Sequence, residues 1–172
     1  MSRLRRIADR DRIFFITTNL AAKVPHLDPA ERDAVLRQLA RQRMKRHFLV
    51  FAYVAMPDHL HLLLSPQRRG VVASMHEFKR ITAERLARSR RSRGPIWQAR
   101  YFDFILRRVE DFWEKLAYIH ENPVAAQLAP RATDWQWSSA RFYERGGKPP
   151  VPVDPINLPA DSKALLWPAP WR

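Results

Sequence analysis

Two histidines stand one residue apart at the start of an apolar run, in the stretch MPDHLHLLLSP at residues 56–66. Alternate residues of a β-strand project from the same face, about 6.5 Å apart along the backbone, so His59 and His61 are expected to point the same way. Paired imidazoles suit divalent metals, and the leucines between and after them fill the opposite face. The alternative for this short motif is two tolerated histidines on a half-exposed strand. Asp58 is expected to form the turn before the strand rather than to orient a histidine.

A second group of candidate residues lies in the helix expected at residues 109–122, VEDFWEKLAYIHEN. At 100° per residue, Tyr118 and Asn122 fall on its polar side, one turn apart. A phenol can act as a nucleophile toward a phosphodiester, and an amide oxygen on the same helix can serve as a third metal ligand. The alternatives are a surface tyrosine and an asparagine cap before Pro123, which is expected to end the helix. His120 falls on the apolar side and is expected in or beside the core.

The charge of the chain favours a polyanionic partner. Lys and Arg total 31 against 17 Asp and Glu, a formal net charge of +14, and arginine predominates. Guanidinium groups match phosphate geometry, so nucleic acid is favoured over a membrane surface or an acidic protein. A GC-rich genome would explain the preference for arginine, but not the excess of positive charge.

Other compositional features exclude several classes. Cysteine is absent, which rules out disulfides, thiolate metal sites and a cysteine nucleophile. No apolar run approaches the roughly 18 residues needed to span a bilayer, and the N-terminal residues lack the apolar core of a secretory signal. A cytoplasmic protein without a membrane partner is expected.

The elements that must position these residues follow a β-α-β-β-α-β-α order. This order predicts an α+β, ferredoxin-like split βαβ fold, with an antiparallel four- to five-stranded sheet and helices on one face. A catalytic domain is expected over residues 1–130, and a tail element with a proline-rich arm over 131–172. Strands are expected at 12–20, 47–57, 59–65 and 101–108, and helices at 30–46, 70–89 and 109–122. The expected apolar positions of the first two helices are Val35, Leu36, Leu39 and Met44, then Val72, Met75, Phe78 and Leu86.

Four segments in register carry a family resemblance: MPDHLHLLLSP, MHEFKRITAERL, WQARYFDFILR and LAYIHENPVAAQLA. Over residues 13–141 they resemble the REP-associated tyrosine transposases, in the single-tyrosine transposase branch of the HUH endonuclease superfamily. The resemblance implies that His59 and His61 are the metal-binding pair, that Asn122 is the third metal-binding position, and that Tyr118 of YIHENP is the nucleophile. It also implies Mg²⁺ or Mn²⁺ as cofactor, single-stranded DNA with a foldback hairpin as substrate, and a 5′-phosphotyrosine intermediate.

The chain departs from that family in two places. Residues 17–29, TTNLAAKVPHLDP, lack an expected glycine-containing stretch, so DNA contacts are not carried over there. The proline-rich extension after Gly147 has no counterpart. Elsewhere, a solvated surface is the alternative to DNA contact for the candidate DNA-binding residues Lys79, Arg80, Arg85, Arg88, Arg90, Arg91, Arg93, Arg100 and Arg107.

The expected function is sequence-specific nicking and strand transfer at REP-like hairpins by a nucleoid-associated bacterial enzyme, with a monomer favoured over a dimer. The alternative is a non-catalytic protein that binds hairpin or palindromic DNA on the same scaffold. An RNA-processing phosphodiesterase that uses histidines as acid and base is disfavoured, because the chain lacks a second, separated His-x-Ser/Thr motif.

Overall fold

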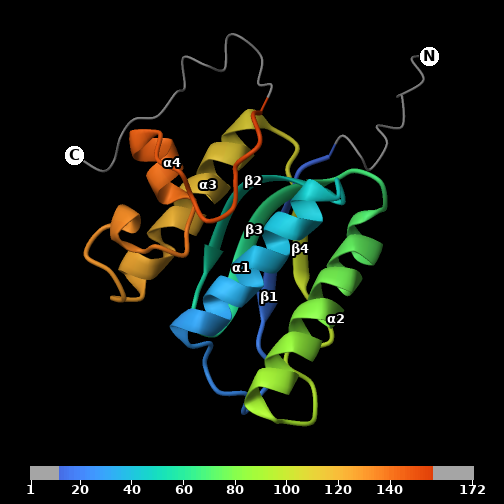
Figure 1. The fold of residues 1–172 in the computed structure, drawn as a ribbon. Coiled ribbons are helices and arrows are strands. Elements are labelled where there is room, and N and C mark those ends of the chain that lie inside the picture. Colours follow the sequence, from blue (N-terminus) through green and yellow to red (C-terminus); the bar gives the residue numbers. More distant parts are fainter. Residues whose placement is uncertain (1–11, 157–172) are drawn as a thin grey trace.

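A computed structural model describes residues 12–156 of the chain (Figure 1). The predicted order of strands and helices is confirmed, and two short helical elements follow it. The elements in chain order are β1 Phe14–Asn19, α1 Pro29–Met44, β2 Phe48–Ala55, β3 His59–Pro66, α2 Val71–Arg90, β4 Phe102–Ile105, α3 Val109–Ala125, the 3₁₀ helix η2 Ala132–Asp134 and α4 Ala140–Arg145.

The strands form one four-stranded sheet in the order β2-β3-β1-β4, and every neighbouring pair is antiparallel. Strands β1 and β2 therefore run parallel with β3 between them, which is the predicted split βαβ arrangement. The two crossover helices α1 and α2 lie side by side over one face of this sheet (Figure 1). Helix α3 packs against β2 and β3 on the other face, so the predicted placement of the helices on one face is wrong in this detail.

Side-chain alternation along β3 separates the core from the candidate site. Leu60, Leu62 and Leu64 share one face and are each about 1 % exposed or less. His59 and His61 project from the opposite face, as the sequence predicts. Burying a leucine contributes roughly 1.5–3 kcal/mol, and shifting the register of β3 by one residue would move all three leucines from this core face to the histidine face. The core therefore fixes which face carries the histidines.

The start of α1 is set by local sequence. Asp28 accepts from the backbone N–H of Glu31, the Glu31 carboxylate accepts from the N–H of Asp28, and Pro29 occupies the first turn. Two of the predicted apolar positions are wrong, since Met44 is 78 % exposed and Val72 is 69 % exposed. Met44 ends α1, beyond its last buried residue, whereas Val72 faces away from the core, since Val71 before it and Met75 after it are buried.

Pro123 does not end α3, contrary to the sequence-based prediction. The helix continues to Ala125, with Pro123 buried in its last turn, and Ala126 is the capping residue. A proline removes only its own backbone donor, which costs little where the helix is about to end. Asn122 therefore keeps helical geometry and does not act as the cap.

The tail covers the outer edge of β2, as the predicted docked element requires. The N–H of Ala55 donates to the carbonyl of Trp137, and Ser138 bridges to Val54. Farther along, Asp154 bonds the N–H of Val50 and pairs with Arg43, which lays the start of the proline-rich arm on the domain. Covering this edge removes a surface prone to strand pairing.

From the sequence, the leucines and tryptophans of the arm are expected to lay it on the domain surface, but these residues fall in 157–172, outside the described residues. None of the helices between residues 12 and 156 combines the length and hydropathy that crossing a bilayer requires.

Candidate active site

One ring nitrogen of His61 is hydrogen-bonded within the protein, and the other has no hydrogen-bond partner among the described residues. Its Nδ1 lies 2.8 Å from the hydroxyl of Thr17, its cross-strand neighbour on β1. Its Nε2 is buried and has no hydrogen-bond partner among the described residues. Burial and the nearby His59 lower the pKa of His61 to about 3, so the imidazole is neutral. A neutral imidazole whose Nδ1–H donates to Thr17 leaves an unshared electron pair on Nε2.

His59 is held in the same way by a carboxylate. Its Nδ1 lies 2.6 Å from Asp58, and its Nε2 lies 3.3 Å from the amide oxygen of Asn122. The prediction that Asp58 only forms the turn is therefore wrong, because its carboxylate also fixes the ring of His59. In both histidines an outer partner holds Nδ1 and leaves Nε2 for a ligand, the usual arrangement around metal-binding imidazoles.

Helix α3 brings the phenol and the amide to these histidines. The ring centroid of Tyr118 lies 5.1 Å from that of His61 and 5.8 Å from that of Phe15, both edge-on. Tyr118 is 49 % exposed, so its hydroxyl end is accessible to a substrate. Asn122 lies one turn later and reaches His59. One helix thus positions both the candidate nucleophile and a candidate ligand.

The donor set fits a divalent cation. Two imidazole nitrogens and one amide oxygen converge, and the buried, unpartnered Nε2 of His61 is satisfied if it coordinates an ion. Such a mixed set, completed by water or phosphate oxygens, suits Mn²⁺ or Mg²⁺. Across residues 12–156 no group of three or more His, Cys, Asp or Glu is arranged to hold a metal. A third protein ligand at this candidate site would therefore be of another type, which the amide of Asn122 offers.

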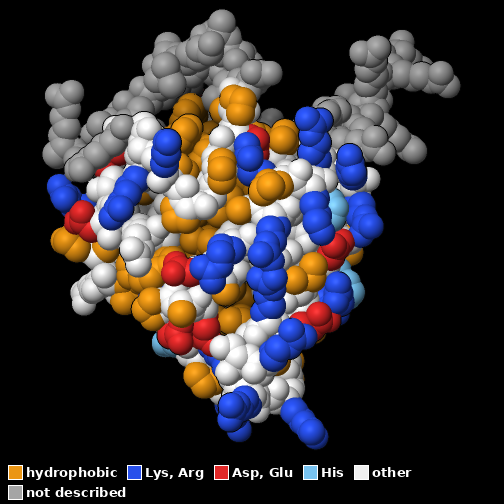
Figure 2. Space-filling view, in the orientation of Figure 1, with side chains coloured by type: hydrophobic (Ala, Val, Ile, Leu, Met, Phe, Trp, Pro, Cys, Tyr) orange, Lys and Arg blue, Asp and Glu red, His pale blue; other side chains and the backbone are white. Residues whose placement is uncertain are grey.

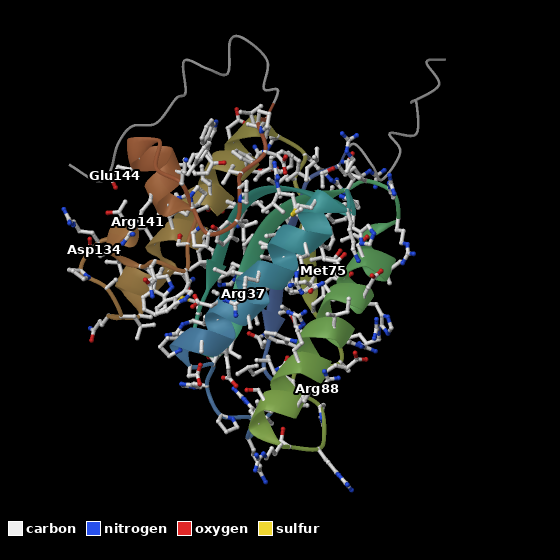
Figure 3. All side chains as sticks on the ribbon, viewed as in Figure 1. Arg37, Met75, Arg88, Asp134, Arg141 and Glu144 are labelled. Atoms are coloured by element: carbon white, nitrogen blue, oxygen red, sulfur yellow. The ribbon has the colours of Figure 1, made fainter. Side chains whose placement is uncertain are left out.

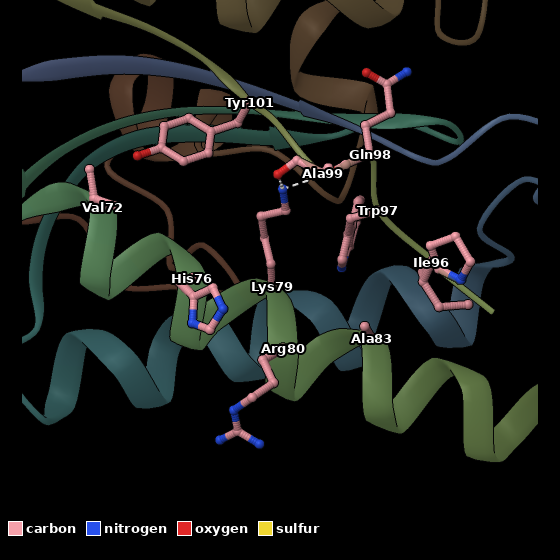
Figure 4. A pocket seen from close by; sticks show the side chains of 11 residues that line it. Val72, His76, Lys79, Arg80, Ala83, Ile96, Trp97, Gln98, Ala99 and Tyr101 are labelled. Atoms are coloured by element: carbon pink, nitrogen blue, oxygen red, sulfur yellow. Dashed lines mark hydrogen bonds between the residues drawn. The ribbon is translucent and has the colours of Figure 1, made fainter. Parts of the chain in front are cut away.

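Three of the predicted DNA-binding cations are engaged within the protein. Arg90 bonds both carboxylate oxygens of Glu31 and two backbone carbonyls. Lys79 donates to the carbonyls of Gln98 and Ala99 at 2.6 and 3.1 Å, beside a hollow of about 330 Å³ (Figure 4). Arg80 forms an exposed ion pair with Glu84.

The other predicted cations on α2 and the loop after it are more accessible. In Figure 2, basic side chains spread over the α1–α2 face and down to the end of α2, where Figure 3 marks Arg88. The loop after this end lies near the turn before His59, because the N–H of Leu20 donates to the carbonyl of Asp58 and that of Ala21 to the carbonyl of Ile96. The histidine side chains project from the opposite face of the sheet. The cations at this end are Arg85, Arg88, Arg91 and Arg93; Arg85 is half-buried and the others are exposed. Arg100 and Arg107 are exposed at the two ends of β4.

Sequence reasoning missed two side chains next to Tyr118. Phe15 is 5 % exposed, and its ring stacks on His61 at 5.5 Å. The Lys115 ammonium lies 5.7 Å from the Phe15 ring. The period-two pattern of β1 could have placed Phe15 and Thr17 on one face, but not opposite His61, because strand pairing is not encoded locally.

The tail fixes α3 through a buried polar network. The Nε2 of His120 lies 2.9 Å from the hydroxyl of Ser139, and that hydroxyl also contacts the backbone N–H and carbonyl of Tyr53. Burial lowers the pKa of His120 to about 3, so it is a neutral core residue, consistent with its expected place. The network ties the tail to the helix that carries Tyr118.

Comparisons with known proteins agree with this arrangement. The family described as "Transposase IS200 like" matches residues 21–122. A REP-associated tyrosine transposase of Escherichia coli K12 is 24 % identical over 156 residues, or 90 % of each chain. The solved structure of a REP-associated tyrosine transposase bound to a REP hairpin aligns with a TM-score of 0.69 and 23 % identity, covering 93 % of this chain and 96 % of that one.

A putative transposase from Deinococcus radiodurans aligns with a TM-score of 0.48 and 17 % identity, over 69 % of this chain and 95 % of its own. The family match and the two REP-associated tyrosine transposases confirm the predicted fold and the family resemblance.

Proposed function

Because this chain belongs to the IS200-like transposase family, we propose that it nicks and rejoins single-stranded DNA at REP-like hairpins through Tyr118. The observation that carries the proposal is the convergence of α3 on the histidine pair. Tyr118 lies against His61, and Asn122 of the same helix reaches His59 at 3.3 Å. A tyrosine that only covers an exposed helix face would have no need to lie beside two histidines and an asparagine that can bind a metal.

The proposed chemistry is a phosphoryl transfer to the phenol. The Tyr118 oxygen attacks phosphorus and forms a phosphotyrosine ester with the 5′ phosphate of the fragment downstream of the break. The P–O3′ bond breaks, and the departing 3′ oxygen takes up a proton as the phenol loses one. Attack by a DNA 3′-OH on the ester reverses these steps and needs no ATP. A divalent cation held by His59, His61 and Asn122 would act as a Lewis acid toward the phosphate oxygens.

The proposed substrate rests on similarity and charge together. The solved relative is bound to a REP hairpin, and exposed arginines gather at the end of α2 and in the loop after it, near the turn before His59. Guanidinium groups there would neutralise hairpin phosphates, so binding should weaken steeply with salt. All proposed reacting groups come from one chain, so we propose that a monomer acts on chromosomal DNA.

The decisive experiment incubates the protein and Mn²⁺ or Mg²⁺ with an end-labelled single strand that contains a REP-like hairpin. We expect a protein–DNA band that persists in denaturant, because the link is covalent. Tyr118→Phe should abolish the band. Tyr101→Phe is the matched control and should retain it, since Tyr101 lies away from the histidines beside Lys79.

A second arm tests the metal ligands. His61→Ala should bind the hairpin with unchanged affinity while adduct formation falls at least a hundredfold. Full cleavage by Tyr118→Phe would contradict the nucleophile assignment. Hairpin binding by the wild-type protein without an adduct in either metal would favour a non-catalytic hairpin-binding protein on this scaffold.

A further inference from the structure

Strand β4 exposes two large aromatic rings on the face that carries the histidines. Phe102 is 59 % exposed and Phe104 is 41 % exposed, although phenylalanine is usually buried. From their position we propose that these rings form a stacking surface for unpaired bases of the single strand next to the reacting phosphate. This inference rests on the proposed function for its substrate class, and it adds a base-binding site to it.

Strand pairing aligns the rings with the candidate active site. Phe102 is the cross-strand partner of Thr17, and Thr17 is the partner of His61. Directly opposite residues of an antiparallel pair share a face, so the three side chains form one row across the sheet. Two strand spacings separate Phe102 from His61, roughly 10 Å. Phe104 occupies the next row, opposite Phe15.

Phe15 joins the exposed rings to the reacting residues. Its ring stacks on His61 at 5.5 Å, meets Tyr118 edge-on at 5.8 Å and meets Phe102 edge-on at 6.3 Å. A row of contacting aromatic rings therefore runs from the histidines through buried Phe15 to the outer edge of the sheet, where the rings of β4 are exposed. A strand whose phosphate lies at Tyr118 would meet these rings with its neighbouring bases.

Charge along this surface also suits a polyanion. The Lys115 ammonium lies 5.9 Å from the Phe104 ring and 5.7 Å from the Phe15 ring. It pairs with Glu114, whose side chain is 68 % exposed, and such pairs are weak enough to yield to a phosphate. The nearest carboxylate on the strand, that of Asp103, alternates to the opposite face of the sheet.

Alternating aromatic and cationic groups favour single-stranded nucleic acid over a second copy of this chain. Bases stack on aromatic rings regardless of their identity, and the flanking cations neutralise phosphates. Arg100 and Arg107 are exposed at the two ends of β4, where a second strongly basic chain would be repelled. Stacking on β4 would hold the strand in place without reading its sequence.

The test measures hairpin binding in EDTA, where binding is read without cleavage. One labelled oligonucleotide carries an intact unpaired strand beside the hairpin, and its twin has abasic sites there. Phe102→Ala and Phe104→Ala should each raise the Kd for the intact oligonucleotide about tenfold, equivalent to about 1.4 kcal/mol. Neither should change the Kd for the abasic twin. Both rings are exposed, so the variants should fold, which thermal unfolding checks.

Matched variants isolate stacking from mere exposure of a ring. Phe142→Ala removes another exposed phenylalanine, on α4, and should leave the Kd unchanged. Phe104→Trp should keep the wild-type Kd, because tryptophan also offers a ring. Phe104→Leu should raise the Kd as Phe104→Ala does, because leucine is apolar but offers no ring. Equal losses with intact and abasic oligonucleotides would overturn the proposal. So would wild-type affinity in a Phe102→Ala/Phe104→Ala double variant. A wild-type dimer that this double variant dissociates without loss of DNA binding would also overturn it.

This outcome is separable from that of the proposed function. Base-dependent binding without any covalent adduct would refute only the tyrosine chemistry. A normal adduct together with insensitive Phe102 and Phe104 variants would refute only the stacking surface.

Discussion

Arg90, one of the predicted DNA-binding cations, has a structural role in the protein instead of contacting DNA, and this assignment can be tested. The structure places its guanidinium 2.6 Å from each carboxylate oxygen of Glu31, and 3.0 and 3.2 Å from the carbonyls of Pro25 and His26. These contacts tie the end of α2 to the start of α1 and to the loop before it. We therefore predict that Arg90→Ala lowers stability and has little direct effect on DNA affinity.

The size of the effect follows from burial. The side chains of Arg90 and Glu31 are 14 % and 9 % exposed, so the free-energy contribution of this ion pair should be closer to that of a buried pair than to that of a surface pair. Removing one partner of a buried pair costs about 3–5 kcal/mol, and a surface pair contributes about 1 kcal/mol or less. We expect Arg90→Ala to cost about 3 kcal/mol. Arg88→Ala, an exposed position on the same helix, should cost less than about 0.5 kcal/mol.

The pH dependence gives an independent measure of the same contact. The hydrogen bonds from Arg90 lower the pKa of Glu31 below its ordinary 4.5. A carboxyl whose pKa falls on folding stabilises the protein above its unfolded pKa, and this stability is lost as the pH drops through the folded pKa. Arg90→Ala should therefore reduce the loss of stability below about pH 4.5.

Urea unfolding of wild type, Arg90→Ala, Glu31→Gln and the double variant provides the assay. A double-mutant cycle should give a coupling free energy of about 1–3 kcal/mol. DNA affinity, measured well below each melting temperature, should stay within about threefold for Arg90→Ala. Zero coupling, or an Arg90→Ala protein of full stability that loses DNA binding tenfold, would refute the reasoning.

Three further predictions concern the site and the tail. Asp58→Asn should weaken Mn²⁺ binding about 10–100-fold, because it weakens the hold on His59; Mn²⁺-dependent shifts in melting temperature would report it, and an unchanged shift would exclude an orienting role. Ser139→Ala should cost about 1–3 kcal/mol in urea, because the buried ring of His120 loses its partner; a neutral substitution would mean that water replaces the hydroxyl. The lowered pKa of His120 should make stability fall as the pH drops from 6.5 toward 3, by up to about 1.4 kcal/mol per pH unit, and His120→Gln should flatten this slope; an unchanged slope would assign it to other groups.

The sequence by itself determined the elements and the groups that each can present. Period-two alternation put His59 and His61 on one face of a strand, and helical spacing put Tyr118 and Asn122 one turn apart. The order of strands and helices then left few topologies, and the split βαβ sheet was among them. These are local properties, because a few neighbouring residues and the backbone geometry define them.

Only the tertiary structure decided which groups meet. It paired Thr17 with His61, brought Phe15 beside Tyr118 and Lys115, and bound Arg90 to Glu31, 59 residues away. Local sequence does not report these contacts, because strand register and helix docking depend on the packing of the whole core. The same limit hid Phe102 and Phe104, since a short apolar strand reads alike whether a neighbour covers its rings or leaves them to solvent.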